Sequence, residues 1–411
     1  MVSTPGVWSS ILRFPATKMP SSWREDAPVY LAGAAAATTV VSIAASQILL
    51  GLAFVAILIA HDKWRWPPVV WPVMLWMTWT LVSLAASGHA SGGMPQIKKF
   101  YVWLMLFVVF SALRSLKQVR ILVMCWTTGV TLSSLWGFWQ FGYRFVTTPK
   151  DFYYAYQSAR ITGFVDHWMT FSALSMITLM MLGALLFFSR NRASFRWLIP
   201  AGVIIGSAFI LAYTKTMWVG AAGGALWLLW WKNKWLAAPI PVLAGVVLLF
   251  NPYHVLDRDK AHRAALREVG WEMIKAHPIV GVGPEQVGPQ FLDYLPADIP
   301  RPIPTEWYYQ HLHNIYFHFA AERGLPALAA LLWFLGQSLF DFFRALQRLP
   351  DDSEARWILH GAIASIIAIL VSGWGEVNLG HSQVLEMFLA VIACGYIAIS
   401  ASNSDFGKAD R

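Results

Sequence analysis

Long apolar runs separated by short polar segments make up most of the chain. We identify twelve runs, at residues 28–45, 46–61, 68–86, 98–113, 121–141, 167–188, 197–213, 216–231, 235–250, 314–341, 357–374 and 380–400. Their lengths are close to the ~20 residues with which a helix crosses a bilayer. The runs are continuously apolar, whereas the strands of a membrane barrel alternate. The pattern predicts an all-α polytopic membrane protein of about twelve transmembrane helices, although the first two runs could form one re-entrant unit.

Composition strengthens this prediction. Of 411 residues, 57% are hydrophobic and only 13% are charged, the mean hydropathy is +0.50, and there are 23 Trp. A soluble fold cannot bury that much apolar surface, so we expect one integral membrane domain over residues 1–411, with membrane lipids around it and no nucleic-acid partner. Both cysteines, Cys125 and Cys394, lie inside apolar runs, so they do not indicate a redox compartment.

The distribution of Lys and Arg predicts the orientation. With a cytoplasmic N-terminus, every short segment on the inner side is basic, as the positive-inside rule requires, and both termini are cytoplasmic. One segment between predicted spans, 251–312, is much longer than the others. It is polar, Pro-rich near its end and on the outer face. Connections of this length are usually functional. We therefore expect the functional site between this loop and the outer ends of the helices.

Cations gather on that outer face. Within the loop, a helix is predicted from about Asp259 to Ala276, and Arg263, Arg267, Trp271 and Lys275 are spaced by four on one side of it. Such a stripe fits a polyanion such as a phosphate ester, or it faces lipid headgroups and water. Asp257-Arg-Asp259 has a metal-binding spacing, but a helix cap explains both residues.

Two more cations stand at the outer ends of predicted spans. Lys215 in "AYTKTMWVG" and Arg160 in "ARITGFVDHW" are costly there unless they reach water or an anion. Snorkelling of the side chain to the interface is the alternative to anion binding.

The stretch His311–Pro326, "HLHNIYFHFAAERGLP", carries three histidines at the start of an apolar run. A short helix is predicted, with a kink or break near Gly324. His313 and His318 are five residues apart and so on different helix faces, which argues against a metal cluster. His318 and Glu322 have a four-residue spacing, but a hydrogen bond on the helix surface explains that pair as well as a metal does.

A general base needs only one neutral imidazole that water and substrate can reach. His313 lies at the junction of loop and helix and meets this condition, although an interfacial histidine is the alternative. The sequence does not reveal what would orient its ring. Glu322 is nine residues on and falls on roughly the opposite side of the helix.

Four motifs in order resemble the O-antigen ligase/polymerase family over about residues 150–375. They are "ITGFVDHWMTFSAL", "YTKTMWVGA", "REVGWEMIKAHPIVGVGPEQV" and "HNIYFHFAAERGLPALAALLWF". The family's members are bacterial inner-membrane glycosyltransferases that use undecaprenyl-diphosphate-linked glycans and act without a metal or nucleotide.

The resemblance implies a role for individual residues. His313 would be the catalytic base and Arg267 a ligand of the diphosphate. Lys215 occupies the place of a second, usually arginine, ligand, which keeps the charge but loses the two-pronged fork. Arg160 and Arg263 are further candidates for binding the diphosphate, and Asn314, Glu322, Arg323 and Trp271 are assigned supporting roles. No cofactor and no metal are expected.

The leading hypothesis is an O-antigen ligase with a periplasmic active site, which transfers glycan from undecaprenyl diphosphate to a sugar of the lipid A core. The alternatives are an O-antigen polymerase with the same donor, a protein oligosaccharyltransferase, and a transporter or flippase. Against transport, the sequence shows no interrupted pair of segments in matching halves and no charged residue in the middle of a predicted span.

Overall fold

The computed structural model describes residues 21–60, 63–147, 160–191, 195–239, 260–297, 299, 301, 303 and 310–409. Every regular element in this part of the chain is a helix, which agrees with the predicted all-α class. The first half contains α1 (Ser21–Thr38), α2 (Ile43–Ile59), α3 (Val70–Ala86), α4 (Ala90–Lys98), η2 (Lys99–Trp103), α5 (Leu104–Ala112), α6 (Leu116–Thr147) and α8 (Trp168–Phe188). The second half contains α9 (Phe195–Leu211), α10 (Lys215–Lys232), α11 (Lys234–Ala237), α13 (Lys260–Ala276), η4 (Phe291–Tyr294), α14 (Ile315–Arg323), α15 (Leu325–Arg348), α16 (Ala355–Ser372), η5 (Asn378–Gly380) and α17 (Ser382–Ala409).

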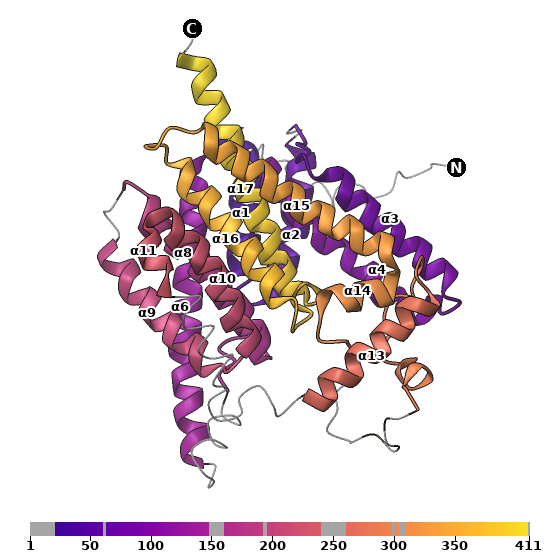
Figure 1. Cartoon of the computed structure of the whole chain (residues 1–411). Coiled ribbons are helices and arrows are strands. Elements are labelled where there is room, and N and C mark those ends of the chain that lie inside the picture. The colour runs from indigo at the N-terminus through magenta and orange to yellow at the C-terminus, as the bar shows by residue number, and fades with distance from the viewer. Residues whose placement is uncertain are drawn as a thin grey trace, which may run out of the picture.

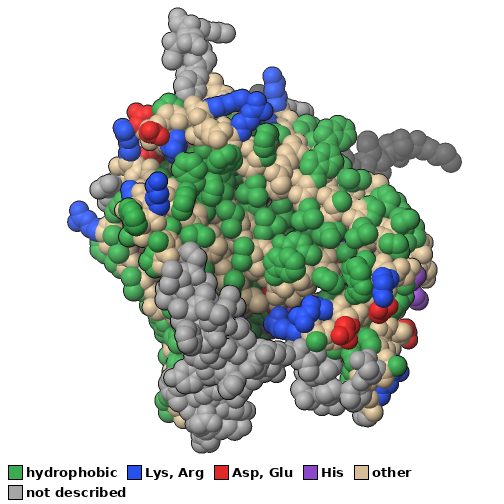
Figure 2. Space-filling model, viewed as in Figure 1, with side chains coloured by type: hydrophobic (Ala, Val, Ile, Leu, Met, Phe, Trp, Pro, Cys, Tyr) green, Lys and Arg blue, Asp and Glu red, His purple; other side chains and the backbone are tan. Residues whose placement is uncertain are grey.

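Five helices among the described residues are long and apolar enough to cross a membrane: α6, α8, α15, α16 and α17. Three shorter ones, α2, α3 and α9, are also apolar. Figure 2 shows a broad field of hydrophobic side chains between two ends that carry charges. The chain is therefore built as a polytopic membrane protein, while the count of twelve spans stays a prediction. Most of the predicted span 235–250, and both Asp257 and Asp259, lie outside the described residues.

Three predicted spans in the first half of the chain can be compared directly with the helices. The first two runs form separate helices, α1 and α2, which pack against each other, and Ser42 caps α2 by accepting a hydrogen bond from the Ala45 N–H. The predicted span 98–113 is not one helix but the 3₁₀ turn η2 followed by the nine-residue α5. The irregular part begins at Lys99, whose ammonium is turned out of the apolar segment and lies 3.5 Å from Glu285.

The buried centre of the bundle is formed by α8, α16 and α17, with α10 packed closely on α16. Glycines allow this approach. A Cβ at Gly220 would lie 2.6 Å from the Ala368 carbonyl oxygen, and one at Gly224 would lie 2.7 Å from that of Ala364. Small residues bring membrane helices together in this way, because lipid offers no hydrophobic force between them. The close contact sets the start of α10 beside the end of α16.

One sequence statement was wrong. A charged residue does occur within the last predicted span: Glu386 lies in α17 and is fully buried. The Ser46 hydroxyl and the Gln47 amide of α2 donate hydrogen bonds to its carboxylate at 2.9 and 3.0 Å. Because these donors come from a helix far away in sequence, the pattern of a single apolar run could not indicate that the charge was compensated.

The predicted break in the histidine stretch is confirmed. α14 ends at Arg323, Gly324 has a φ of 82°, and α15 starts at Leu325 and runs towards the end of the molecule where α17 also ends (Figure 1). The loop after α13 lies against this break, where the N–H groups of Val282 and Gly283 donate to the carbonyls of Ala321 and Glu322. A Cβ at Gly324 would lie 1.9 Å from the Ile279 carbonyl oxygen. The break therefore fastens α13 to the helix that follows His313.

Candidate functional site

A cavity of about 380 Å³ opens where four segments far apart in sequence meet. These are the chain leading into α8, the start of α10, the start of α13 and the loop before α14. The turn after α16 completes the wall with Glu376. The lining residues are Arg160, Trp168, Met169, Tyr213, Thr214, Lys215, Thr216, His262, Arg263, His313 and Glu376. The structure thus brings together His313 and three of the four expected cations, Arg160, Lys215 and Arg263.

The turn after α16 supplies Glu376, and several contacts fix it. The Ile315 N–H donates to the Gly373 carbonyl at 2.8 Å, and the Asn314 amide donates to the Trp374 carbonyl at 3.1 Å. From α13, Arg263 Nη1 donates to the Gly375 carbonyl at 3.0 Å. These hydrogen bonds therefore fix the position of the turn relative to both α13 and α14.

Glu376 is the partner that orients His313. Its Oε2 lies 3.3 Å from His313 Nδ1, and its side chain is 1% exposed against 17% for the histidine. Burial alone would raise the pKa of Glu376. The hydrogen bond and charge of His313 and the hydrogen bond from the Val377 N–H outweigh burial and hold that pKa below its usual value. A carboxylate on Nδ1 directs the other ring nitrogen, Nε2, to act as the proton acceptor.

The backbone of His313 is unusual. Its φ is +46°, in the left-handed region that a residue with a Cβ seldom adopts. Such conformations cost of order 1–3 kcal/mol and persist where the surrounding contacts fix them. Here Asn314 caps α14, because its side-chain oxygen accepts from the Tyr316 and Phe317 N–H groups. The cap and the left-handed residue together turn the imidazole into the cavity.

Two further histidines stand beside His313. The ring centroids of His311 and His313 are 4.3 Å apart, and the His313 N–H points at His311 Nδ1 over 3.4 Å. His262 of α13 approaches from the other side, with its ring centroid 6.1 Å from that of His313. Burial, reinforced by the neighbouring His313, lowers the pKa of His311 to about 3. His311 is therefore neutral at pH 7 and adds no charge next to the candidate base.

An aromatic ring lies between two of the cations. The Arg160 guanidinium and the Lys215 ammonium lie 5.5 and 5.6 Å from the ring centroid of Tyr213, and Arg160 also lies 4.9 Å from that of Trp168. Tyr213 itself has a φ of +50° and packs edge-on against Trp218. Cation–π attraction of this kind favours a position of both cations beside the same ring. Both side chains line the cavity on the same side as Tyr213.

Arg267 and Trp271 are placed differently from Arg263. Both are exposed further along α13, and neither is among the described residues that line the cavity. Trp271 is 53% exposed and lies 6.5 Å, centroid to centroid, from Phe317 of α14. The predicted stripe exists, but only its first member, Arg263, reaches the cavity, and Arg267 lies one turn outside it.

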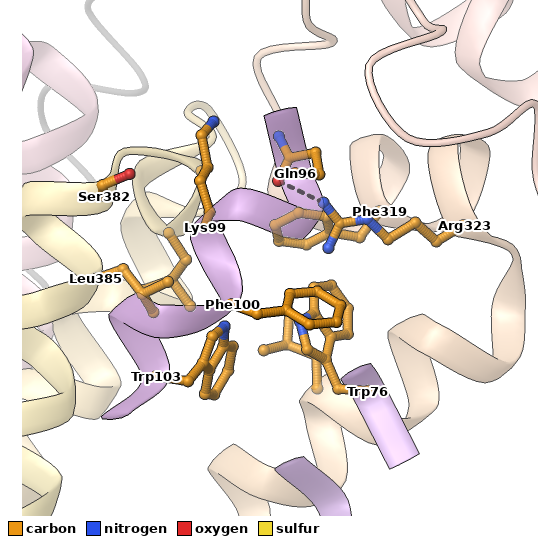
Figure 3. Close-up of a pocket in the computed structure, with 12 residues that line it drawn as sticks. Trp76, Gln96, Lys99, Phe100, Trp103, Phe319, Arg323, Ser382 and Leu385 are labelled. Carbon is orange, nitrogen blue, oxygen red and sulfur yellow. Dashed lines mark hydrogen bonds between the residues drawn. The ribbon is translucent and has the colours of Figure 1, made fainter. Parts of the chain in front are cut away.

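Neither Glu322 nor Arg323 lines the cavity at His313; Arg323 lines a separate cavity of about 30 Å³ shown in Figure 3. Arg323 is 4% exposed; it donates to Gln96 at 2.9 Å and lies over the rings of Trp76 and Phe319. The Glu322 carboxylate accepts a hydrogen bond from the Glu285 N–H at 2.7 Å. This space admits only one or two water molecules. Glu322 therefore fastens the α14–α15 break to the loop after α13, and Arg323 fastens it to α4.

The structure also groups three possible metal ligands, although not those with the metal-like spacing. Ligand atoms of His311, His313 and Glu376 all lie within 4.8 Å of one another. His318, by contrast, lies 3.9 Å from Glu322, in the pairing that its spacing favoured. A His–His–carboxylate set is compatible with a divalent transition metal. Arg160, Lys215 and Arg263 line the same cavity and would repel a dication there, while they favour an anion.

Sequence reasoning missed Glu376 and Tyr213. Glu376 follows a predicted span in "SGWGEV", where a carboxylate at a helix end carries no signal by itself. A useful signal was available in Gly373 and Gly375, since glycines on both sides of Trp374 indicate a tight backbone. A Cβ at Gly373 would lie 2.5 Å from Ile315, and one at Gly375 would lie 2.3 Å from Thr216.

Comparison with known proteins agrees with the motif analysis. Residues 200–332 match the family model described as O-antigen ligase. This range contains Tyr213, Lys215, Arg263, Arg267 and His313, whereas Arg160 and Glu376 lie outside it. The resemblance to the O-antigen ligase/polymerase family is thereby confirmed over the centre of the chain. A search of curated proteins found no match.

Proposed function

We propose that the chain is an O-antigen ligase: a metal-independent, inverting glycosyltransferase of the bacterial inner membrane. It moves glycan from undecaprenyl diphosphate to a sugar of the lipid A core on the periplasmic face. The observation that carries the proposal is the His313–Glu376 pair at the wall of a cavity lined by three cations, with His313 inside the segment that matches the family.

In this proposal the cations bind the diphosphate. Arg263 presents a fork that can engage two phosphate oxygens, while Arg160 and Lys215 act on either side of Tyr213. Arg267 contributes from the mouth of the cavity, where it meets the donor before the diphosphate is seated. As the bond from the anomeric carbon to the diphosphate oxygen breaks, negative charge grows on that oxygen, and fixed cations stabilise it without reorganising.

His313 acts as the base. Its Nε2 accepts the proton of the acceptor hydroxyl while the hydroxyl oxygen attacks the anomeric carbon from the side opposite the leaving group. The resulting imidazolium is stabilised by the buried Glu376 carboxylate, which stays ionised because its pKa is lowered. A displacement in line inverts the anomeric configuration. Donor binding, charge stabilisation and proton removal are then all supplied by side chains.

The cationic lining supports a base rather than a metal at His313. If a metal held by His311, His313 and Glu376 were required, prolonged incubation with EDTA would abolish transfer and zinc would restore it. The proposal predicts full activity after such treatment, measured with purified protein, lipid-linked donor and lipid A-core acceptor.

An O-antigen polymerase has the same donor chemistry and is the second candidate. Lipopolysaccharide from a strain lacking the chain separates them on a gel. Loss of a ligase removes all O-antigen from the core and leaves lipid-linked polymer behind. Loss of a polymerase leaves cores that carry one repeat unit. An unchanged ladder of lipopolysaccharide bands would refute both the ligase and the polymerase. A protein oligosaccharyltransferase or a transporter would then be the remaining candidates.

A further inference from the structure

A second large cavity, of about 630 Å³, lies at the end of the molecule opposite the His313 site. α15 and α17 form most of it, near the point where α17 leaves the bundle at the top of Figure 1. Its lining residues are Pro68, Gln337, Asp341, Arg344, Ala345, Arg348, Leu349, Tyr396, Ile399, Ser402 and Asn403. Lys and Arg side chains gather at this end in Figure 2.

Two arginines give the cavity its charge. Arg344 and Arg348 are four residues apart and project from the same side of α15. Within the part of the chain that the structure describes, neither forms an ion pair, whereas neighbouring Arg356 and Arg190 pair with Asp351 and Asp352. Two guanidinium groups that line one cavity one helical turn apart, with no ion pair among the described residues, can together bind the oxygens of one phosphate.

The rest of the lining suits a lipid rather than a free phosphate ion. Ala345, Leu349 and Ile399 are apolar, and α15 and α17 are both long enough to cross a membrane. A free ion would leave these walls in water, while a phospholipid covers them with its glycerol and acyl chains. Basic pockets between membrane helices bind anionic headgroups for this reason.

Asp341 is the carboxylate among the described lining residues, and its depth decides which headgroup fits. Asp341 precedes Arg344 by three residues, so it lies about 4.5 Å further from the polar end of α15, and the Tyr396 hydroxyl already donates to it at 2.9 Å. In phosphatidylethanolamine the ammonium lies outside the phosphate, towards water. An ammonium therefore cannot reach Asp341 while the phosphate engages Arg344 and Arg348. Because the two arginines lie nearer the polar end of α15 than Asp341, the cavity favours a headgroup with net negative charge.

We propose that this cavity is a binding site for an anionic glycerophospholipid of the phosphatidylglycerol type, with its phosphate on Arg344 and Arg348. The site is independent of the glycosyltransferase proposal. It would couple the packing of α15 and α17 to the lipid composition of the membrane leaflet on this side.

Native mass spectrometry of the purified full chain tests the proposal with two added lipids, phosphatidylglycerol and phosphatidylethanolamine with identical acyl chains. We expect tighter binding of phosphatidylglycerol, weakened at least tenfold in the Arg344→Gln/Arg348→Gln variant. The control variant, Arg190→Gln/Lys232→Gln, loses the same charge at the same end outside the cavity and should keep the affinity.

Three results would overturn the site. Equal affinity of the wild-type chain for the two lipids would remove the argument from charge order, and this comparison needs no variant. An equal loss in the control variant would reduce the effect to surface charge. Retention of a phosphatidylglycerol adduct of unchanged affinity in the double arginine variant would place the lipid elsewhere.

Discussion

Tyr213 is the residue through which two cations act together. Replacing it by leucine removes both cation–π contacts and keeps an apolar side chain of moderate size. Because each contact contributes about 0.5–1 kcal/mol or more, we expect the KM for the lipid-linked donor to rise about tenfold, with a smaller change in kcat. Steady-state kinetics with varied donor measures this effect.

Tyr213→Phe is the matched control, since it keeps the ring and loses only the hydroxyl. It should retain a KM close to that of the unmodified chain. If phenylalanine and leucine raised the KM equally, the ring would not be responsible.

His311 makes the stability of the site depend on pH. Its pKa is about 3 in the folded chain, against an ordinary value of 6.5. Between these two pH values the imidazole is protonated in the unfolded chain and neutral in the folded chain. Stability is therefore present above pH 6.5 and is lost as pH falls below it; at pH 5.5 the loss from this one residue is about 1.4 kcal/mol. The lowered pKa of Glu376 acts in the same direction at more acid pH, below its ordinary 4.5.

The measurement is the thermal unfolding midpoint in detergent at pH 7.5 and 5.5, for the unmodified chain and His311→Gln. The variant should lose less on acidification, because glutamine does not titrate. Equal losses would show that His311 is protonated in the folded chain.

At the scale of elements, the break between α14 and α15 controls the site. Gly324 combines a φ of 82° with a Cβ position 1.9 Å from a backbone oxygen. We expect Gly324→Ala to destabilise the chain by at least about 2 kcal/mol, since a residue with a Cβ in this positive-φ, extended conformation costs about 1–3 kcal/mol before any steric clash, and to lower transfer activity because His313 precedes this helix. Thermal unfolding and initial rates measure the two effects.

Gly336→Ala, within α15, is the control, because an added Cβ there meets no atom within 4 Å. Alanine favours a helix over glycine by about 1 kcal/mol, so this variant should be slightly more stable. Destabilisation of both variants alike would mean that α15 tolerates no added methyl group, whatever its position.

The sequence predicted elements well where local chemistry decides them. The helix over 259–276 and the break at Gly324 follow from periodicity, proline and glycine, and the structure has α13 and a break there. It predicted the site only in part. His313, Lys215, Arg160 and Arg263 were named, but the partner of His313 comes from a turn 63 residues away. No local pattern encodes a pairing that depends on how α16 is placed beside α10 and α13.

At the scale of the whole molecule, the account requires the two large cavities to open on opposite sides of the membrane. We expect Ala276→Cys, at the end of α13, to react with an impermeant maleimide in intact spheroplasts. Ser353→Cys, in the turn after α15, should react only after the membrane is permeabilised. Both variants are made with Cys125 and Cys394 replaced, since Cys125 is exposed. Labelling of both sites from the same side would refute the predicted orientation.

The central claim is that His313, oriented by Glu376, removes the proton from the acceptor. The most direct measurement is the rate of glycan transfer by purified His313→Gln and Glu376→Gln variants, with lipid-linked donor and lipid A-core acceptor, after thermal unfolding has shown that both are folded. General-base catalysis typically contributes 10²–10⁴-fold. The account predicts a loss of about that size for His313→Gln with little change in donor KM, and a smaller loss for Glu376→Gln. A folded His313→Gln variant that transfers glycan at the unmodified rate would contradict it.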